Sequence, residues 1–145
     1  MMSRHEISRT YRSCVYGTVK SEKGTIDTPI GRSKSDRKKM TVTADGKPAR
    51  THFEVFERLD NASDLSVCLE TGRTHQIRVH MAYIGHPVIG DPIYAPRRNA
   101  MGLKGQALHS SSLSFNHPQT GEVLHLKTEL PDYYVTLLDK LRSVY

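Results

Sequence analysis

Residues 70–80 read ETGRTHQIRVH, and the hydrophobic period of the chain changes across them. Before this stretch, apolar and polar residues alternate over 65–69, which predicts a half-buried strand. After it, Ile77, Met81 and Ile84 recur at the spacing of one helix face. The stretch therefore joins a strand to a helix, and the rest of the fold is expected to form around this corner.

The ends of the predicted helix carry recognisable signals. Thr74 is a suitable N-cap, and Gly85, followed by His86 and Pro87, is a suitable stop. Rigid elements on both sides of a corner hold its side chains in place, so corners are common locations for sites. Two Arg, two His and one Gln gather around this short helix. We expect a site here; the alternative is that the arginines form ordinary surface ion pairs.

Outward from the corner, the alternation of apolar residues predicts four further strands, at residues 9–16, 51–59, 107–115 and 122–127. Residues 24–48 are punctuated by Gly and Pro and predict a loop. The segment after Pro131 predicts an amphipathic helix through Val135, Leu138 and Leu141. The pattern predicts a single α+β domain over residues 1–145, dominated by antiparallel sheet.

The composition excludes several classes of protein. The chain has 145 residues, 37% of them apolar, and no apolar run long enough to span a bilayer. Cys14 and Cys68 form no CxxC pair and no disulfide framework, so a reducing cytoplasm is expected. His75, His80 and His86 are spaced by five and six residues rather than four, and a metal site is therefore not expected.

Most of the positive charge lies in one segment. The net charge is +6, and residues 31–50 hold seven Lys and Arg against two Asp. A concentrated basic loop favours a polyanion, most commonly a nucleic acid. The alternative is a solvated loop whose charge serves solubility, and charge by itself leaves the two readings even.

The corner and the segment after it, GHPVIGDPIY at 85–94, closely resemble the arginine-containing signature of the RluA-type RNA pseudouridine synthases. Further stretches are similar to the same family: RTYRSCVYG at 9–17, GTIDTPIGR at 24–32, DRKKM at 36–40 and LHSSSLSFNHP at 108–118. Within the first of these, Ser13 stands where the family has Ala. The resemblance spans nearly the whole chain and implies the C-terminal part of a catalytic domain.

Enzymes of this family detach uracil from its ribose, rotate it and rejoin it through C5, without cofactor or metal. The resemblance implies that Tyr11 stacks on the flipped uracil, that Arg78 pairs with the catalytic carboxylate and that Leu108 walls the base pocket. The remaining candidate substrate-binding residues are Arg73, His75 and Gln76 at the corner, and Arg32, Arg37, Lys38 and Lys39 in the basic loop. The expected partner is RNA, foremost ribosomal RNA, and no association with a membrane is expected.

The nucleophile of the family is the Asp of an H-R-L-D-x-x-T-S-G motif that precedes the Tyr strand, and this chain contains no such motif. The segment at 58–64 imitates it, but it lacks the His and lies at a turn, so Asp60 is interpreted as a turn residue. We expect the chain to be inactive alone and to need an N-terminal portion of the same enzyme. The alternatives are a non-catalytic RNA-binding module and a gene fragment without function. Because earlier strands are missing, we expect an open sheet edge and weak protection from hydrogen exchange in residues 9–16.

Overall fold

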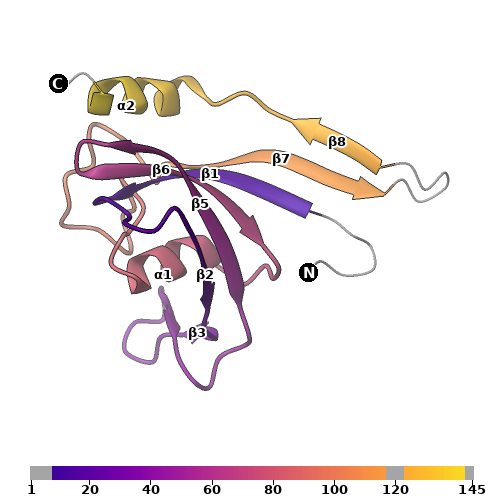
Figure 1. Cartoon of the computed structure of the whole chain (residues 1–145). Coiled ribbons are helices and arrows are strands. Elements are labelled where there is room, and N and C mark those ends of the chain that lie inside the picture. Colours follow the sequence, from indigo (N-terminus) through magenta and orange to yellow (C-terminus); the bar gives the residue numbers. More distant parts are fainter. Residues whose placement is uncertain (1–7, 117–122, 143–145) are drawn as a thin grey trace.

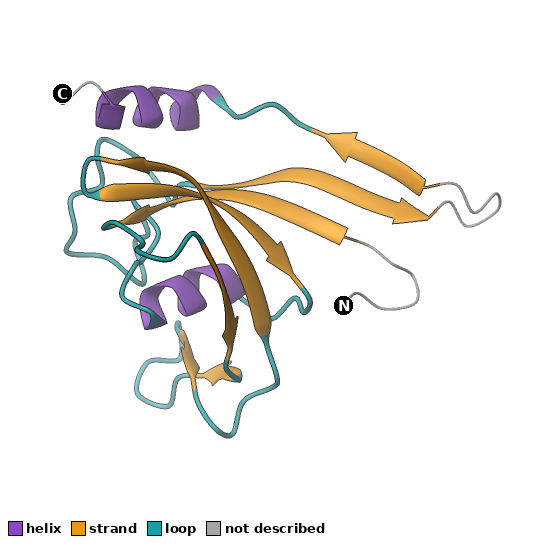
Figure 2. Ribbon diagram, viewed as in Figure 1, coloured by secondary structure: helices purple, strands orange, loops and turns teal. Residues whose placement is uncertain are grey.

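A computed structural model describes residues 8–116 and 123–142 of the chain. Its elements, in chain order, are β1 (Ser8–Tyr16), β2 (Lys23–Asp27), β3 (Ile30–Arg32), β4 (Met40–Val42), β5 (Arg50–Leu59), β6 (Ala62–Leu69), α1 (Gln76–Tyr83), β7 (Leu108–Asn116), β8 (Val123–Lys127) and α2 (Asp132–Arg142). Within these ranges, six strands pair antiparallel in the order β2-β5-β6-β1-β7-β8, and β3 and β4 form a separate hairpin (Figures 1 and 2). The α+β class with a mostly antiparallel sheet is confirmed.

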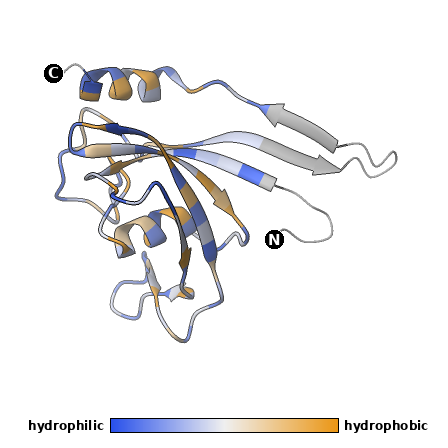
Figure 3. Ribbon diagram, in the orientation of Figure 1, coloured by the Kyte–Doolittle hydropathy of each residue, from blue (hydrophilic) through white to orange (hydrophobic). Residues whose placement is uncertain are grey.

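The two helices lie against opposite sides of the sheet (Figure 1). Residues of β6 alternate between these sides, so that Asp64 contacts α2 while Leu65 and Val67 belong to the core beneath α1. Ile77 and Met81 of α1 are buried in the same core, and hydrophobic residues appear in both α1 and β6 in Figure 3. In the ranges that the structure describes, neither helix is long and apolar enough to cross a membrane.

β1 lies in the interior of the sheet, where it pairs with β6 on one side and β7 on the other. Cys14 and Val15 are fully buried. The expectation that residues 9–16 lie near an open edge is therefore wrong, and their pairing on both sides predicts strong rather than weak protection from hydrogen exchange. Sheet order depends on pairings between distant segments, which the local periodicity of one strand does not encode.

The segment predicted as a loop over 24–48 contains three short strands, β2, β3 and β4. Strands of three to five residues are too short for a two-residue period to stand out from chance. Gly24 of β2 pairs with Phe53 of β5, and a Cβ on this glycine would lie 2.8 Å from the Phe53 ring. The glycine that suggested a loop is therefore the residue that lets β2 approach the sheet.

Three further boundaries differ from the prediction. The N-cap of α1 is His75, with φ 56° in the left-handed region, and not Thr74. The turn before β6 is confined to Asp60 and Asn61, so β6 begins three residues earlier than the strand predicted over 65–69. In α2, Leu138 and Leu141 are buried as predicted, but Val135 is 41% exposed, and Tyr134 and Leu137 complete the buried face. Residues 117–122, which include most of the gap between the last two predicted strands, lie outside the described residues.

A buried polar cluster attaches α2 to the sheet. The fully buried carboxylate of Asp64 forms an ion pair with Arg12 and accepts a hydrogen bond of 2.7 Å from the Tyr134 hydroxyl. Burial and the nearby charge of Asp64 raise the pKa of Tyr134, so its hydroxyl stays protonated and can donate. The Arg12 guanidinium also lies 4.2 Å from the ring centre of Phe56 and covers it.

Replacing Ser13 with alanine should raise the free energy of unfolding by about 1 kcal/mol, because a buried hydroxyl without a partner is costly. Ser13 is fully buried, and among the described residues its hydroxyl has no hydrogen-bond partner. Urea unfolding monitored by circular dichroism measures the change. Ser111→Ala is the matched control, because the Ser111 hydroxyl donates to the Thr10 carbonyl at 3.0 Å and its loss should destabilise. A lower stability for Ser13→Ala would show that the hydroxyl has a partner.

Candidate functional site

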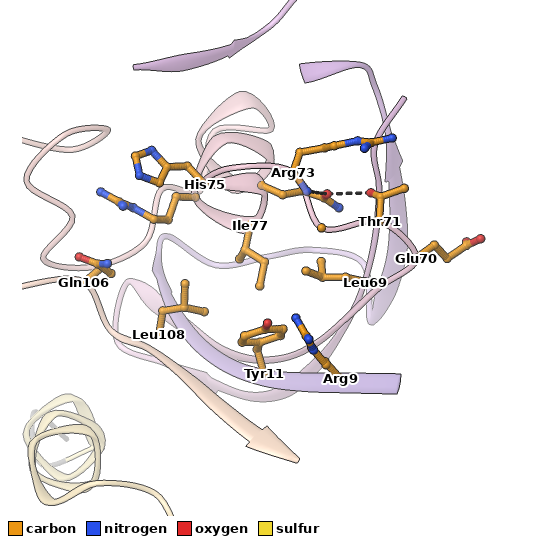
Figure 4. A pocket seen from close by; sticks show the side chains of 13 residues that line it. Arg9, Tyr11, Leu69, Glu70, Thr71, Arg73, His75, Ile77, Gln106 and Leu108 are labelled. Atoms are coloured by element: carbon orange, nitrogen blue, oxygen red, sulfur yellow. Dashed lines mark hydrogen bonds between the residues drawn. The ribbon is translucent and has the colours of Figure 1, made fainter. Parts of the chain in front are cut away.

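A cavity of about 520 Å³ opens where the strand-to-helix corner faces the middle of the sheet (Figure 4). Its walls come from the start of β1, the end of β6, the turn after β6, the first turn of α1 and the segment that leads into β7. Six of the residues singled out in the sequence line it: Tyr11, Arg73, His75, Gln76, Arg78 and Leu108. The structure thus gathers candidates from three distant parts of the chain.

One side of the cavity is apolar. Figure 4 shows Tyr11 beside Leu108, with Ile77 and Leu69 across from them. These four side chains give the cavity apolar walls that exclude water and suit a planar ring. Sequence reasoning counted Ile77 and Leu69 only as core residues, because their periodicity shows that they point inward but not that a cavity lies there.

A β-bulge determines how β1 presents Tyr11. Thr10 pairs with Ser112 but Tyr11 pairs with Ser110, so Ser111 is the extra residue on β7. Its hydroxyl donates to the Thr10 carbonyl at 3.0 Å and ties the bulge to β1. Bulges redirect nearby side chains, and this one lies beside the aromatic residue of the cavity.

Arg78 is held in place by Asp91. Its Nε and Nη2 donate to the two carboxylate oxygens at 2.9 and 2.8 Å, and both residues are buried, with 8% and 1% exposed. Burial works to raise the pKa of Asp91, but hydrogen bonds from Arg78 and the amides of Tyr94 and Ile93 outweigh it and hold the pKa below its usual range. The resemblance implies that Arg78 faces a catalytic carboxylate from outside the chain; within the chain, its partner is Asp91. Among described residues, none accepts a hydrogen bond from its Nη1.

Gln76 has a structural position that the sequence did not reveal. Its Oε1 accepts from the Thr71 hydroxyl at 2.7 Å and the Arg73 amide at 3.0 Å. Its Nε2 donates to the Arg50 carbonyl at 3.0 Å and the Thr51 hydroxyl at 2.9 Å. The amide therefore ties the turn after β6 to β5, and its four hydrogen bonds leave it little capacity to contact a substrate.

His75 lies at the rim of the cavity and is fixed by Tyr94. Its Nδ1 is 2.9 Å from the Tyr94 hydroxyl, which also accepts the Met40 amide at 2.9 Å. The hydroxyl can accept from Met40 and still donate its own proton to Nδ1 when that nitrogen is unprotonated. Burial and the charge of Arg78 lower the pKa of His75, which favours the neutral ring. Tyr94 and Asp91, both from the 85–94 stretch, thus contact His75 and Arg78 directly, although neither was among the candidate site residues.

The remaining histidines of the corner have structural contacts. His80 is buried, with Nδ1 2.7 Å from the Thr51 hydroxyl and Nε2 3.0 Å from the Thr28 carbonyl. His86 places its Nδ1 2.8 Å from the Tyr16 carbonyl. Across residues 8–116 and 123–142, no three His, Cys, Asp or Glu side chains are grouped in a way that could hold a metal ion.

Only some of the candidate residues of the basic loop lie near the cavity. Arg32 lines a second, smaller hollow that adjoins the cavity, whereas Arg37, Lys38 and Lys39 line neither hollow; Arg37 and Lys38 are exposed and Lys39 is half-buried. Arg9 lines the cavity from β1, and its place in the RTYRSCVYG stretch was the signal that could have marked it. Asp60 lies at the turn between β5 and β6, at the opposite end of these strands from Leu69, which supports its interpretation as a turn residue.

The chain belongs to the RNA pseudouridylate synthase family, whose model matches residues 1–83. It is 51% identical over 137 residues to the uncharacterised RNA pseudouridine synthase YlyB of Bacillus subtilis, covering 94% of this chain and 45% of that protein. It is 40% identical to the ribosomal large subunit pseudouridine synthase D of Haemophilus influenzae, covering 99% and 48%. The chain spans less than half of the length of these curated relatives.

Among solved structures, the chain resembles human RNA pseudouridylate synthase domain containing 1, with a TM-score of 0.78 and 28% identity. The match covers 94% of this chain and 59% of that one. The chain therefore corresponds to a portion of a pseudouridylate synthase domain, as the signature at the corner indicated.

Proposed function

We propose that this chain forms the base pocket of an RNA pseudouridine synthase and is the C-terminal part of its catalytic domain. The observation that carries the proposal is the meeting of Tyr11, Leu108 and Arg78 around one cavity. Family membership supports the reaction, isomerisation of uridine to pseudouridine in structured RNA. The relatives named as ribosomal large subunit pseudouridine synthase D support ribosomal RNA as the substrate class.

A base can react in this cavity only after it has left its stack. In the proposed complex the uracil lies on Tyr11 with Leu108 at its edge, and Arg73 and Arg9 contact the backbone. The bond between N1 and the ribose breaks, the uracil turns, and a bond forms between C5 and the ribose; C5 loses its proton and N1 gains one. Tyr11 assists the removal of the C5 proton.

The nucleophilic carboxylate comes, in this proposal, from a polypeptide segment that residues 1–145 do not include. The free Nη1 of Arg78 would hold it ionised, while Asp91 fixes the other two donors. Glu70 is the one acidic residue among the described residues that line the cavity, and its carboxylate points away from it toward Arg50 and His52 (Figure 4). It is therefore a poor substitute for the missing nucleophile.

Binding tests the pocket directly. The probe is a five-residue RNA whose central residue is uridine and whose other four are abasic ribose, so that only one base can occupy the cavity. Tyr11→Ala should weaken its binding by about 5- to 100-fold, since an aromatic stack on a base is worth roughly 1–3 kcal/mol. Tyr83→Ala is the matched control, because Tyr83 is 59% exposed on α1 and does not line the cavity.

A fully abasic RNA of the same length distinguishes stacking from backbone contact. Tyr11→Ala should leave its affinity unchanged, and NMR titration of the purified chain measures both affinities. Equal losses of affinity for the two RNAs, or no loss for either, would mean that Tyr11 does not stack on the base and that the proposed base pocket is wrong.

In a tritium-release assay with uridine-containing RNA, the chain alone should give no product; turnover that disappears in Asp60→Ala would mean that the nucleophile lies within the chain.

The orientation of Glu70 also favours a second candidate, a non-catalytic RNA-binding module. Such a module would bind the uracil RNA through the same cavity but would release no tritium even when an H-R-L-D-x-x-T-S-G segment is restored by fusion ahead of residue 1. Release from that fusion, lost again in Arg78→Met, would favour the synthase.

A further inference from the structure

The hollow beside the cavity has its own wall of basic residues. It measures about 380 Å³ and lies between the β3–β4 hairpin and the turn after β6. Three cationic side chains line it, those of Arg32, Lys47 and Arg73. Gly72 and Arg73 line both this hollow and the larger cavity, so the two spaces share a wall.

The backbone around the hollow is rigidly built. Lys47 and Ile30 exchange two backbone hydrogen bonds of 2.9 Å each, which attach the turn before β5 to β3. Gly46 makes this contact possible, because a Cβ on it would lie 2.4 Å from the Ile30 carbonyl carbon. The position of Lys47 is therefore set by the fold and not by a free loop.

Two of the three cations are also anchored by part of their own side chain. Arg32 donates its Nη1 to the Arg37 carbonyl at 2.7 Å, and Arg73 donates its Nε to the Pro48 carbonyl at 2.8 Å. Each guanidinium keeps further N–H groups for a ligand, while its orientation is restricted in advance. A preorganised guanidinium loses less entropy when it binds an oxyanion than a freely rotating one does.

The charge of the hollow favours an anion. Asp45 is the acidic residue among the described residues that line it, against three cations. Its carboxylate is 3.6 Å from the Lys34 ammonium, which lies outside the hollow, and both side chains are largely exposed. Ile30 and Met40 add apolar surface to the wall, which suits a ribose next to a phosphate better than a fully hydrated free ion.

We propose that this hollow is a backbone subsite that binds the RNA phosphate adjoining the flipped uridine. The proposal rests on the function proposed above, because the shared wall places the hollow next to the base only if the base occupies the cavity. An RNA strand whose uracil lies on Tyr11 carries its neighbouring phosphate past Gly72 and Arg73. Arg32, Lys47 and Arg73 then hold that phosphate and fix which side of the uridine the strand leaves.

The test uses the same five-residue RNA with its single uracil, now with one neutral methylphosphonate at each of its four linkages in turn. With the wild-type chain, neutralising one of the two linkages that flank the uridine should weaken binding about tenfold, the effect expected for losing one charge-assisted contact. Neutralising any of the other linkages should weaken binding less. Lys47→Gln should weaken binding of the unmodified RNA similarly and lower the slope of log affinity against log salt by about 0.7.

Combining Lys47→Gln with the neutralised linkage shows whether Lys47 contacts that phosphate. In Lys47→Gln, neutralising the critical linkage should cause no further loss, because the charge it would remove has no partner. Lys20→Gln, a loss of one exposed charge outside both hollows, serves as the control and should retain full sensitivity to that linkage. A tenfold penalty that persists in Lys47→Gln, or equal sensitivity at all four linkages, would overturn the subsite.

Gly72→Glu gives a second measure that leaves the fold intact. A Cβ on Gly72 would meet nothing within 4 Å, so the side chain can project into the open space without displacing its neighbours. A carboxylate there should weaken RNA binding more than tenfold, with an unchanged unfolding midpoint. If Tyr11→Ala impairs base-dependent binding while Lys47→Gln and Gly72→Glu do not, only the subsite is wrong; if Tyr11→Ala has no effect, the proposed function is wrong.

Discussion

Replacing Asp91 with alanine should lower the free energy of unfolding by about 3–5 kcal/mol, the cost of leaving one member of a buried ion pair without its partner. Arg78 would keep its charge at 8% exposure, with two donors no longer satisfied. The amides of Ile93 and Tyr94, which donate to the same carboxylate at 3.0 and 3.1 Å, would also lose their acceptor. Urea unfolding at pH 7 measures the difference.

The same pair predicts a dependence on pH. The folded-state pKa of Asp91 lies below its usual range, so its ionisation stabilises the folded chain above an unfolded-state pKa of about 4. This contribution is lost as pH falls through the lower, folded pKa. The stability gap between wild type and Asp91→Ala should therefore be full at neutral pH and narrow progressively below about pH 4.

Asp45→Ala is the matched control for Asp91. Asp45 also forms an ion pair, but its partner Lys34 is 3.6 Å away and both side chains are largely exposed. Pairs of this kind contribute little, so the control should change stability by less than about 1 kcal/mol. Similar small losses in both variants would mean that Asp91 is not the anchor of Arg78, and the pocket wall would have to be held in another way.

Gln76→Ala should cost about 2–4 kcal/mol, because it removes four hydrogen bonds at a site only 2% exposed and leaves several buried groups unpaired. The turn between Thr71 and Arg73 would lose the attachment to β5 that Gln76 provides and keep only the hydrogen bond from the Arg50 amide to the Thr71 hydroxyl. Thermal and urea unfolding measure the loss. RNA affinity should also fall, as an indirect result of the displaced Arg73.

Gln106→Ala is the matched control for Gln76. Gln106 lines the same cavity, but among described residues its side chain makes no hydrogen bond, so its truncation should leave stability nearly unchanged. The comparison distinguishes a structural role of Gln76 from a substrate-binding role. If Gln76→Ala weakens RNA binding without loss of stability, Gln76 contacts the substrate, as its position in the signature first suggested.

The strand-to-helix corner and the interior strands were predictable from sequence. The period changes from two to nearly four residues across 70–80, and β5, β6 and α1 all lie close to their predicted ranges. The β3–β4 hairpin was not predictable, because three-residue strands carry no measurable period. It nevertheless positions Arg32 beside the cavity.

Within the site, the sequence pointed to six of the thirteen lining residues but did not reveal the partners that Gln76 and Arg78 have within the chain. The amide of Gln76 and the guanidinium of Arg78 are polar groups on a short helix, and local sequence does not say whether such groups face solvent, substrate or the chain itself. Their partners, Thr51 and Asp91, lie 25 and 13 residues away.

The amino-acid sequence alone determined the class of elements, the corner that joins them, the concentration of basic residues and the family. These follow from local periodicity and from the identity of adjacent residues, which are written directly in the chain. Only the tertiary structure decided that β1 is an interior strand, that Asp91 holds Arg78 and that Arg32 and Lys47 share a hollow with Arg73. Those relations arise when the sheet forms and the helices pack on it, which brings distant segments within hydrogen-bond distance, and no pattern along a single segment encodes that step.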